Sequence, residues 1–156
     1  MTGVMEDERR KQTEQKLIES GKAEFLKKGY AKANLRDICK AAGVTTGAFY
    51  FSFANKEALL AAILDPVIAD YERMCSMFAQ REEEDPGTAD DNERQIMEYL
   101  SAHRMEAIIL MDQCAGSRYE MFKPQIKLQM QEAFTSFLRN SWAESLTQSL
   151  SESWCP

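Results

Sequence analysis

The segment that most constrains the fold is residues 35–57, LRDICKAAGVTTGAFYFSFANKE. A short helix is predicted at its start, because four apolar residues fall there at helical spacing: Leu35, Ile38, Cys39 and Ala42. Asn34 stands before this helix as an N-cap, and Gly43 follows it, where a left-handed C-cap is favoured. A second helix, capped by Thr45, is expected over about 46–52. It is too short to be stable alone, so neighbouring helices must hold it.

This pair of short helices has features of a DNA-reading motif. Thr46, Gly47 and Ala48 are small, which leaves the start of the second helix open to close approach. Phe49 and Phe53 lie four positions apart and can anchor one face of that helix. A short helix with small polar residues at its tip and exposed aromatic residues on one side suits the major groove of DNA.

A longer pattern runs through this motif and extends beyond it on both sides. It consists of Leu17-Ile18, Phe25, Gly29-Tyr30, Ile38, Ala42-Gly43-Val44, Gly47, Tyr50, Phe53, Lys56-Glu57 and Leu59. Together they resemble the signature of tetracycline-repressor (TetR) family regulators. The resemblance is firm over about the first third of the chain. It implies an all-α fold with an N-terminal three-helix helix-turn-helix domain, residues 1–55. A long helix would join this domain to a C-terminal helical ligand-binding and dimerisation domain, residues 56–156, which is short for the family.

The same resemblance places the DNA contacts on nine residues: Asn34, Arg36, Thr45, Thr46, Gly47, Ala48, Tyr50, Phe51 and Lys56. Threonine hydroxyls can bond base edges or phosphates, and a lysine at a helix N-terminus favours a phosphate. Few strong base readers (Arg, Asn or Gln) occupy the second helix of the motif, so discrimination would depend on hydroxyls, methyl contacts and DNA shape. Phe51 either packs on a thymine methyl or pads the surface of the first helix, and the sequence leaves both open.

Charge is distributed unevenly along the chain. The net charge is −6, but residues 1–57 carry +3 and residues 58–156 carry −9. A basic N-terminal segment followed by an acidic remainder is typical of a DNA-binding module with a separate second domain. No apolar run reaches the roughly 18 residues that a membrane span needs, and the charged N-terminus lacks the apolar core of a signal peptide. A cytoplasmic protein with no membrane partner is therefore expected.

Residues that would carry catalysis or bind metal are sparse. Cys39, Cys75, Cys114 and Cys155 are scattered, with no CxxC pair or Cys/His cluster, so neither a metal site nor a cofactor is expected. His103 is the single histidine, and no P-loop, dinucleotide fingerprint or HExxH motif occurs. These observations argue against an enzyme, although a small helical enzyme with a vestigial DNA-binding head remains the least favoured alternative.

The rest of the chain is predicted to be helical, with few Gly and Pro residues and no alternating strand pattern. Pro66 should bend or restart the long helix, and Ser117 with Glu120 forms a capping box that should open a helix at Arg118. The expected elements are a flexible arm over 1–12, helices over 13–28 and 56–79, a loop over 80–92, helices over 93–103 and 125–142, and a buried helix over 104–114.

The second domain offers residues for an effector pocket and a dimer interface. Nine methionines suit an adaptable apolar cavity, and a pocket is predicted among Tyr71, Met74, Phe78, Met97, Leu100, His103, Met111, Arg118, Tyr119 and Phe122. The resemblance favours a dimer interface over intramolecular core for Ile126, Met130, Phe134, Phe137, Leu138 and Trp142. The leading hypothesis is a homodimeric repressor, released from a near-palindromic DNA operator by a small, largely apolar effector. The alternative is a DNA-binding protein with no effector, architectural or protein-partnered, whose body is solid core.

Overall fold

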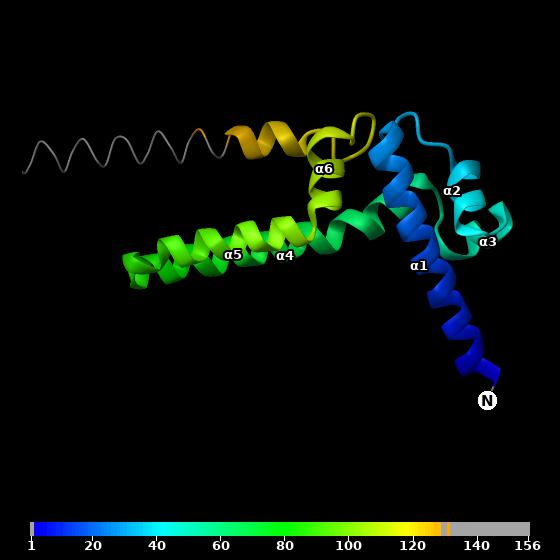
Figure 1. The fold of residues 1–156 in the computed structure, drawn as a ribbon, viewed down its shortest axis with the longest axis horizontal. Coiled ribbons are helices and arrows are strands. Elements are labelled where there is room, and N and C mark those ends of the chain that lie inside the picture. The colour runs from blue at the N-terminus through cyan, green and yellow to red at the C-terminus, as the bar shows by residue number, and fades with distance from the viewer. Residues whose placement is uncertain (1, 129–130, 132–156) are drawn as a thin grey trace, which may run out of the picture. The chain divides into compact units, whose positions relative to one another are not determined.

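The computed structural model describes residues 2–128 and 131, and all regular structure in them is helical, as the sequence predicts (Figure 1). The chain divides into two compact units, Met1–Glu120 and Met121–Pro156. The domain boundary predicted at residue 55 stays a prediction. The elements of the first unit are α1 (Thr2–Lys28), α2 (Leu35–Ala42), α3 (Thr46–Ser52), α4 (Lys56–Glu84), the 3-10 turn η1 (Pro86–Thr88), α5 (Ala89–Ala102) and α6 (Arg104–Asp112).

The first three helices share one apolar core with the start of α4. Leu17 and Phe25 of α1, Ile38 of α2, Phe49 of α3 and Leu59 of α4 are fully buried. Burial of side chains of this size stabilises each by about 1.5–3 kcal/mol, which is how the seven-residue α3 is held.

Glycine at position 21 allows α1 and α4 to approach closely. A Cβ added at Gly21 would lie 2.9 Å from a methyl carbon of Leu59 and 3.3 Å from one of Ile63. Helix propensity alone makes a mid-helix glycine unfavourable by about 1 kcal/mol against alanine. At this position the missing side chain leaves room for the leucine and isoleucine side chains of α4.

The predicted caps of the helix-turn-helix are confirmed. Oδ1 of Asn34 accepts the N–H of Arg36 at 2.9 Å, and Oγ1 of Thr45 accepts the N–H of Ala48 at 3.1 Å. Gly43 ends α2 with φ of 69°, and its N–H faces the carbonyls of Cys39 and Lys40. Only glycine adopts this left-handed conformation without strain, so the turn between α2 and α3 depends on it.

The prediction of a flexible arm over residues 1–12 is wrong, because α1 begins at Thr2. Oppositely charged side chains spaced one helical turn apart account for the difference. Lys11 pairs with Asp7 at 2.9 Å, and Arg10 pairs with Glu14 at 3.1 Å. Each such pair adds a few tenths of a kcal/mol to an exposed helix, and the pairs extend α1 beyond its buried stripe.

The long helix α4 is continuous through Pro66, so of the two alternatives predicted there, a bend or a restart, the restart does not occur. Pro66 lies on the exposed side of α4, where water can satisfy the carbonyl that loses its N–H partner. The predicted loop over 80–92 is also mostly helical, since α4 ends at Glu84 and α5 begins at Ala89.

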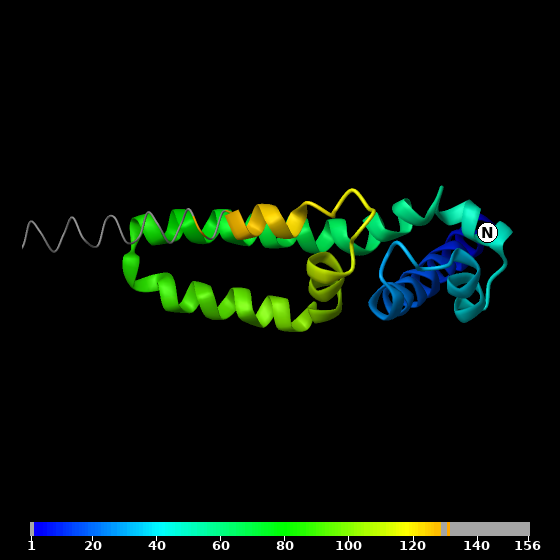
Figure 2. The ribbon, with the colours of Figure 1, turned by 90° about the horizontal axis from the view of Figure 1, so that it is seen from above.

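Helices α4 and α5 form an antiparallel hairpin around η1 (Figure 2). Asn92, almost fully buried, donates to the Glu82 carboxylate at 2.8 Å and accepts from Arg81 at 3.2 Å, which ties the two helices together next to their connection. Helix α6 then contacts α1, α4 and α5. Its predicted burial on all sides is only partly correct, because Ile109 and Leu110 are buried whereas Ile108 is exposed.

No helix starts at Arg118, so the predicted capping box is wrong. Residues 115–121 form turns instead, in which Ser117 Oγ accepts the N–H of Tyr119 and donates to the carbonyl of Cys114. Glu120 accepts the N–H of Gly116 at 3.2 Å. In the second unit residues 122–128 and 131 are helical, which agrees with the start of the helix predicted over 125–142, and the rest of that helix lies outside the described residues.

Candidate nucleic-acid interface

Helix α3 presents one buried face and one open face. Phe49 is fully buried, and its ring centroid lies 5.4 Å from that of Tyr50 and 5.7 Å from that of Phe53. Thr45, Thr46 and Gly47 are exposed at the start of the helix, and Ala48 is half-buried. Two large side chains project outward, Tyr50 at 58% and Phe51 at 85% exposure. The open face therefore offers hydroxyls, bare backbone and aromatic surface.

At the start of α2, Asn34 and Arg36 are both exposed. Oδ1 of Asn34 is occupied by the N-cap hydrogen bond, which leaves the amide nitrogen of the side chain as a donor. Lys28, the last residue of α1, pairs with Glu24 of the same helix at 2.8 Å and with Asp37 of α2 at 2.9 Å. The Lys28 ammonium lowers the pKa of Asp37 and keeps that carboxylate charged beside α2.

Lys56 turns its ammonium inward. Its Nζ donates to the carbonyl of Tyr30 at 2.6 Å and to that of Ala33 at 3.1 Å, and it lies 4.4 Å from the centre of the Tyr30 ring. Two of its three donors are thereby used within the protein. The sequence does not reveal this arrangement, because residues 30 and 56 are distant along the chain.

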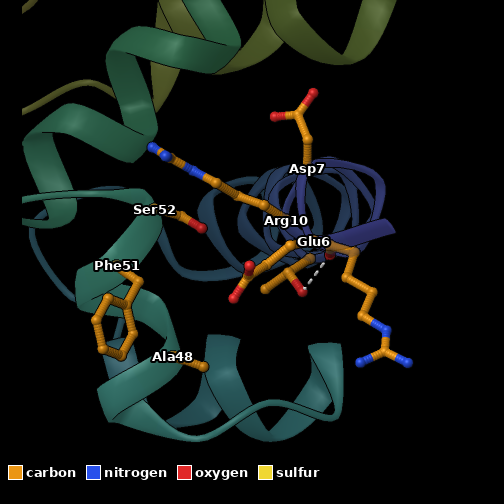
Figure 3. A pocket seen from close by; sticks show the side chains of 8 residues that line it. Glu6, Asp7, Arg10, Ala48, Phe51 and Ser52 are labelled. Atoms are coloured by element: carbon orange, nitrogen blue, oxygen red, sulfur yellow. Dashed lines mark hydrogen bonds between the residues drawn. The ribbon is translucent and has the colours of Figure 1, made fainter. Parts of the chain in front are cut away.

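A hollow of about 530 Å³ lies between the start of α1 and the open side of α3 (Figure 3). Its α3 wall consists of Ala48, Phe51 and Ser52, and its α1 wall consists of Glu6, Asp7, Arg9, Arg10 and Thr13. Sequence reasoning missed this hollow because it treats residues 1–12 as a flexible arm. The signal that would have revealed it is the i, i+4 charge pairing that extends α1.

Comparison with known proteins agrees with this geometry. The family described as bacterial regulatory proteins, tetR family, matches residues 17–63, which run from the middle of α1 into α4. This match includes the α2–α3 motif with its caps and buried aromatic anchors. Residues 17–63 form a TetR-family domain.

Similar proteins include transcriptional regulators from several bacteria. The HTH-type transcriptional regulator TtgR of Pseudomonas putida is 35% identical over 79 residues, which cover 51% of this chain and 38% of that protein. The probable acrEF/envCD operon repressor of Escherichia coli is 49% identical over 47 residues, 30% of this chain and 21% of that protein. The chain thus spans less than half the length of these relatives.

A solved structure extends the similarity beyond the TetR-family domain. It is the crystal structure of NalD, the secondary repressor of the MexAB-OprM multidrug efflux pump in Pseudomonas aeruginosa. The TM-score is 0.58 at 26% identity, over 78% of this chain and 62% of NalD. The similarity supports the all-helical architecture described above. The relatives named here are regulators rather than enzymes.

A set of hydrogen bonds connects the turn after α1 and the start of α4 to the residues that follow α6. The N–H of Tyr30 donates to the carbonyl of Gln113 at 2.8 Å. The phenol of Tyr30 donates to Oε2 of Glu57 at 2.5 Å, and Oε1 of Glu57 accepts the N–H of Arg118 at 2.9 Å. Asp65 then accepts from Arg118 at 2.7 Å and from the Tyr119 hydroxyl.

The residues predicted to line an effector pocket differ in how deeply they are buried. Phe78 and Tyr119 are buried, Met97 and Arg118 are exposed, and Phe122 belongs to the second unit. The half-buried ones are Tyr71, Met74, Leu100, His103 and Met111. The structure brings Arg118 and Tyr119 together, with the guanidinium 4.8 Å from the ring centre. The rings of His103 and Tyr99 also lie against each other in a tilted arrangement, with 4.3 Å between their centroids.

The predicted dimer-interface residues lie almost entirely outside the described part of the chain. Ile126 is half-buried in the second unit. The others, which fall outside the described residues, are Met130, Phe134, Phe137, Leu138 and Trp142. A dimer through these residues stays a prediction.

Residues 2–128 and 131 contain neither a candidate metal site nor a candidate membrane span. No cluster of three or more His, Cys, Asp or Glu side chains in this range could hold a metal ion. None of the helices in this range combines the length and apolar character that crossing a bilayer requires.

Proposed function

We propose that this chain is a sequence-specific DNA-binding transcriptional regulator that acts as a repressor. The observation that supports this most directly is the open face of α3, which is held on a buried aromatic anchor within a TetR-family domain. An α-helix with such a face fits the major groove, where base edges are distinguishable. Asn34 and Arg36 add exposed polar and basic groups at the start of α2.

Two copies of the chain would act together on a near-palindromic operator, each with its α3 in a successive major groove. A second copy supplies the contacts that one short helix lacks. A small and largely apolar effector would release the DNA by acting on the helices after α3. Helix α4 suits this role, because it runs unbroken over 29 residues from the turn after α3 to the connection with α5. No catalytic role is part of this proposal.

Selection of bound sequences from a random pool of duplex DNA tests the proposal. A palindrome with half-sites about one helical turn apart is the expected result. Thr46→Glu should abolish the enrichment, because it places a negative charge on the exposed start of α3. Ser76→Glu, on the exposed side of α4, adds the same charge away from α3 and should leave the enrichment intact.

Two results would overturn the proposal. One is the absence of any enriched sequence at low salt. The other is an affinity for the enriched DNA that stays flat between low and moderate salt, since phosphate contacts release counterions and make binding salt-dependent. Loss of enrichment in both glutamate variants would show that charge anywhere on the protein, rather than α3, governs the result.

A further inference from the structure

Phe51 is the most exposed of the large apolar side chains in the described residues, at 85%. The possibility that it pads the surface of α1 is therefore excluded. The two nearby phenylalanines differ from it, since Phe49 of α3 and Phe53, which caps the end of α3, are buried and pack on each other. Full burial of a phenylalanine stabilises a protein by about 1.5–3 kcal/mol relative to exposure. This side chain contributes almost none of that to the fold.

The residues around Phe51 on α3 are small. Gly47 and Ala48 lie one helical turn before it, and Ser52 follows it. No long side chain of α3 therefore covers the ring on that side. Figure 3 shows Ala48 and Ser52 turned toward α1, with Glu6 and Arg10 across from them, while the Phe51 ring lies over α3 at the edge of the hollow. The result is an apolar surface on α3 at the rim of the hollow.

The charges around this hollow are balanced. Its α1 wall carries two acidic side chains, Glu6 and Asp7, and two basic ones, Arg9 and Arg10. Asp7 is already paired with Lys11, and Arg10 with Glu14. A phosphate gains little in such surroundings, because binding sites for phosphate carry an excess of positive charge. An uncharged, partly apolar group fits the hollow better.

The major groove presents one apolar group, the 5-methyl of thymine. Residues 46–52 contain no Arg, Asn or Gln, so α3 has none of the side chains that bond a base edge in bidentate fashion. We propose that Phe51, together with Ala48, recognises thymine in the operator by packing on its 5-methyl group. This inference rests on the proposed DNA-binding function and names the residue that sets part of its specificity.

Base analogues test the contact atom by atom. In the selected operator, each thymine is replaced in turn by deoxyuridine, which lacks only the methyl. At one symmetric position, wild-type affinity should fall about 4-fold per half-site, the value of one buried methyl-sized group. A cytosine at that position should bind more tightly when it is replaced by 5-methylcytosine, because this restores a methyl at the same place in the groove.

Protein variants identify the side chain that makes the contact. Phe51→Ala should weaken binding to the thymine duplex and bind the thymine and deoxyuridine duplexes equally. Phe51→Leu, which stays apolar, should keep part of the difference. Tyr50→Phe removes an exposed hydroxyl on the same helix and should keep the full difference even where affinity falls. Unchanged thermal unfolding of Phe51→Ala confirms that the variant is folded.

The outcomes separate this inference from the proposed function. Specific operator binding with no deoxyuridine effect at any position overturns the inference and leaves the proposed function standing. A deoxyuridine effect that persists in Phe51→Ala overturns it too, since another residue then reads the methyl. A change of oligomeric state in Phe51→Ala with an unaltered thymine-to-deoxyuridine ratio shows that the ring meets a second copy instead. Absence of specific DNA binding overturns both proposals.

Discussion

Tyr30 and Glu57, which lie 27 positions apart in the sequence, are joined by a 2.5 Å hydrogen bond from the phenol to one carboxylate oxygen. Burial and this bond raise the pKa of Tyr30 to about 12. Burial opposes the charged form of Glu57, but the hydrogen bonds from Tyr30 and from the N–H of Arg118 outweigh it and lower the pKa of Glu57. The pair therefore keeps a neutral phenol and a charged carboxylate throughout the neutral range. It fixes the turn after α1 to the start of α4.

Tyr30→Phe removes the donor of this bond and leaves the ring over which Lys56 lies. We expect the free energy of unfolding to fall by about 2 kcal/mol, the contribution of a hydrogen bond to a charged group. Urea unfolding followed by circular dichroism measures the change. Tyr50→Phe removes an exposed hydroxyl and should have almost no effect. Equal stability of the two variants would show that the Tyr30–Glu57 bond contributes nothing net.

A second long-range pair joins α1 to α6. Nζ of Lys22 lies 2.7 Å from Oε1 of Glu106, and both side chains are mostly buried. Burial raises the pKa of Glu106, but the hydrogen bond from Lys22 and the nearby charges of Lys22 and His103 outweigh it, so the net pKa lies below the ordinary 4.5. Burial lowers the pKa of Lys22, but Glu106 and Glu19 outweigh it, so the net pKa lies above the ordinary 10.5.

These directions give the pair a defined pH window. The carboxylate contributes stability above its unfolded pKa of about 4.5 and loses it as the pH falls through the lower folded value. The ammonium contributes below 10.5 and loses it as the pH rises through the higher folded value. Glu106→Gln should therefore lower the unfolding free energy by about 2 kcal/mol at pH 7. The difference from wild type should vanish in strong acid, as urea titrations at several pH values would show. A difference that stays constant down to pH 3 would contradict the assignment.

The turn between α2 and α3 gives a matched pair of glycine variants. Gly43 has φ of 69° and no atom within 4 Å of an added Cβ, so Gly43→Ala carries backbone strain alone. We expect it to lower the unfolding free energy by about 1–2 kcal/mol. Gly47 lies in α3, where an added Cβ would be 3.7 Å from Oγ1 of Thr45, an ordinary contact. Gly47→Ala should raise stability by up to about 1 kcal/mol through helix propensity. Thermal unfolding of both variants checks the opposite signs.

Local rules predict the helix-turn-helix well. Asn34, Gly43 and Thr45 each act within four residues of their own position, so the sequence alone identifies the two helices and the turn between them. The fully buried Phe49 also follows from helical spacing. The all-α class and the open face of α3 could be predicted for the same reason.

Long-range contacts explain what the sequence did not reveal. Lys56 looks like a phosphate ligand from its place at the start of a helix, yet its ammonium bonds carbonyls more than 20 residues away. Ser117 and Glu120 match a capping box, yet the N–H of Arg118 bonds Glu57, 61 positions earlier, and no helix begins there. In both cases a distant partner outweighs the local pattern.

Arg36 is the predicted DNA contact most easily examined by salt dependence. It is exposed at the start of α2, so Arg36→Ala should leave the fold intact. If it neutralises one phosphate, the slope of log affinity against log salt should become shallower by about 0.9. Fluorescence anisotropy with the selected operator measures this slope. Arg94→Ala removes an exposed arginine of α5 and should leave the slope unchanged. An unchanged slope in Arg36→Ala would remove this residue from the interface.

Lys56→Ala should lower stability and leave the salt slope unchanged, the reverse of what we expect for Arg36→Ala. The Lys56 ammonium supports two carbonyls of the turn that precedes α2, so Lys56→Ala leaves both acceptors without this donor. We expect the unfolding free energy to fall by about 2 kcal/mol, because the lost bonds are charge-assisted. The salt slope should stay within error of wild type, since the charge is directed into the protein rather than toward phosphate. A slope shallower by about 0.9 with unchanged stability would instead assign the ammonium to the DNA backbone.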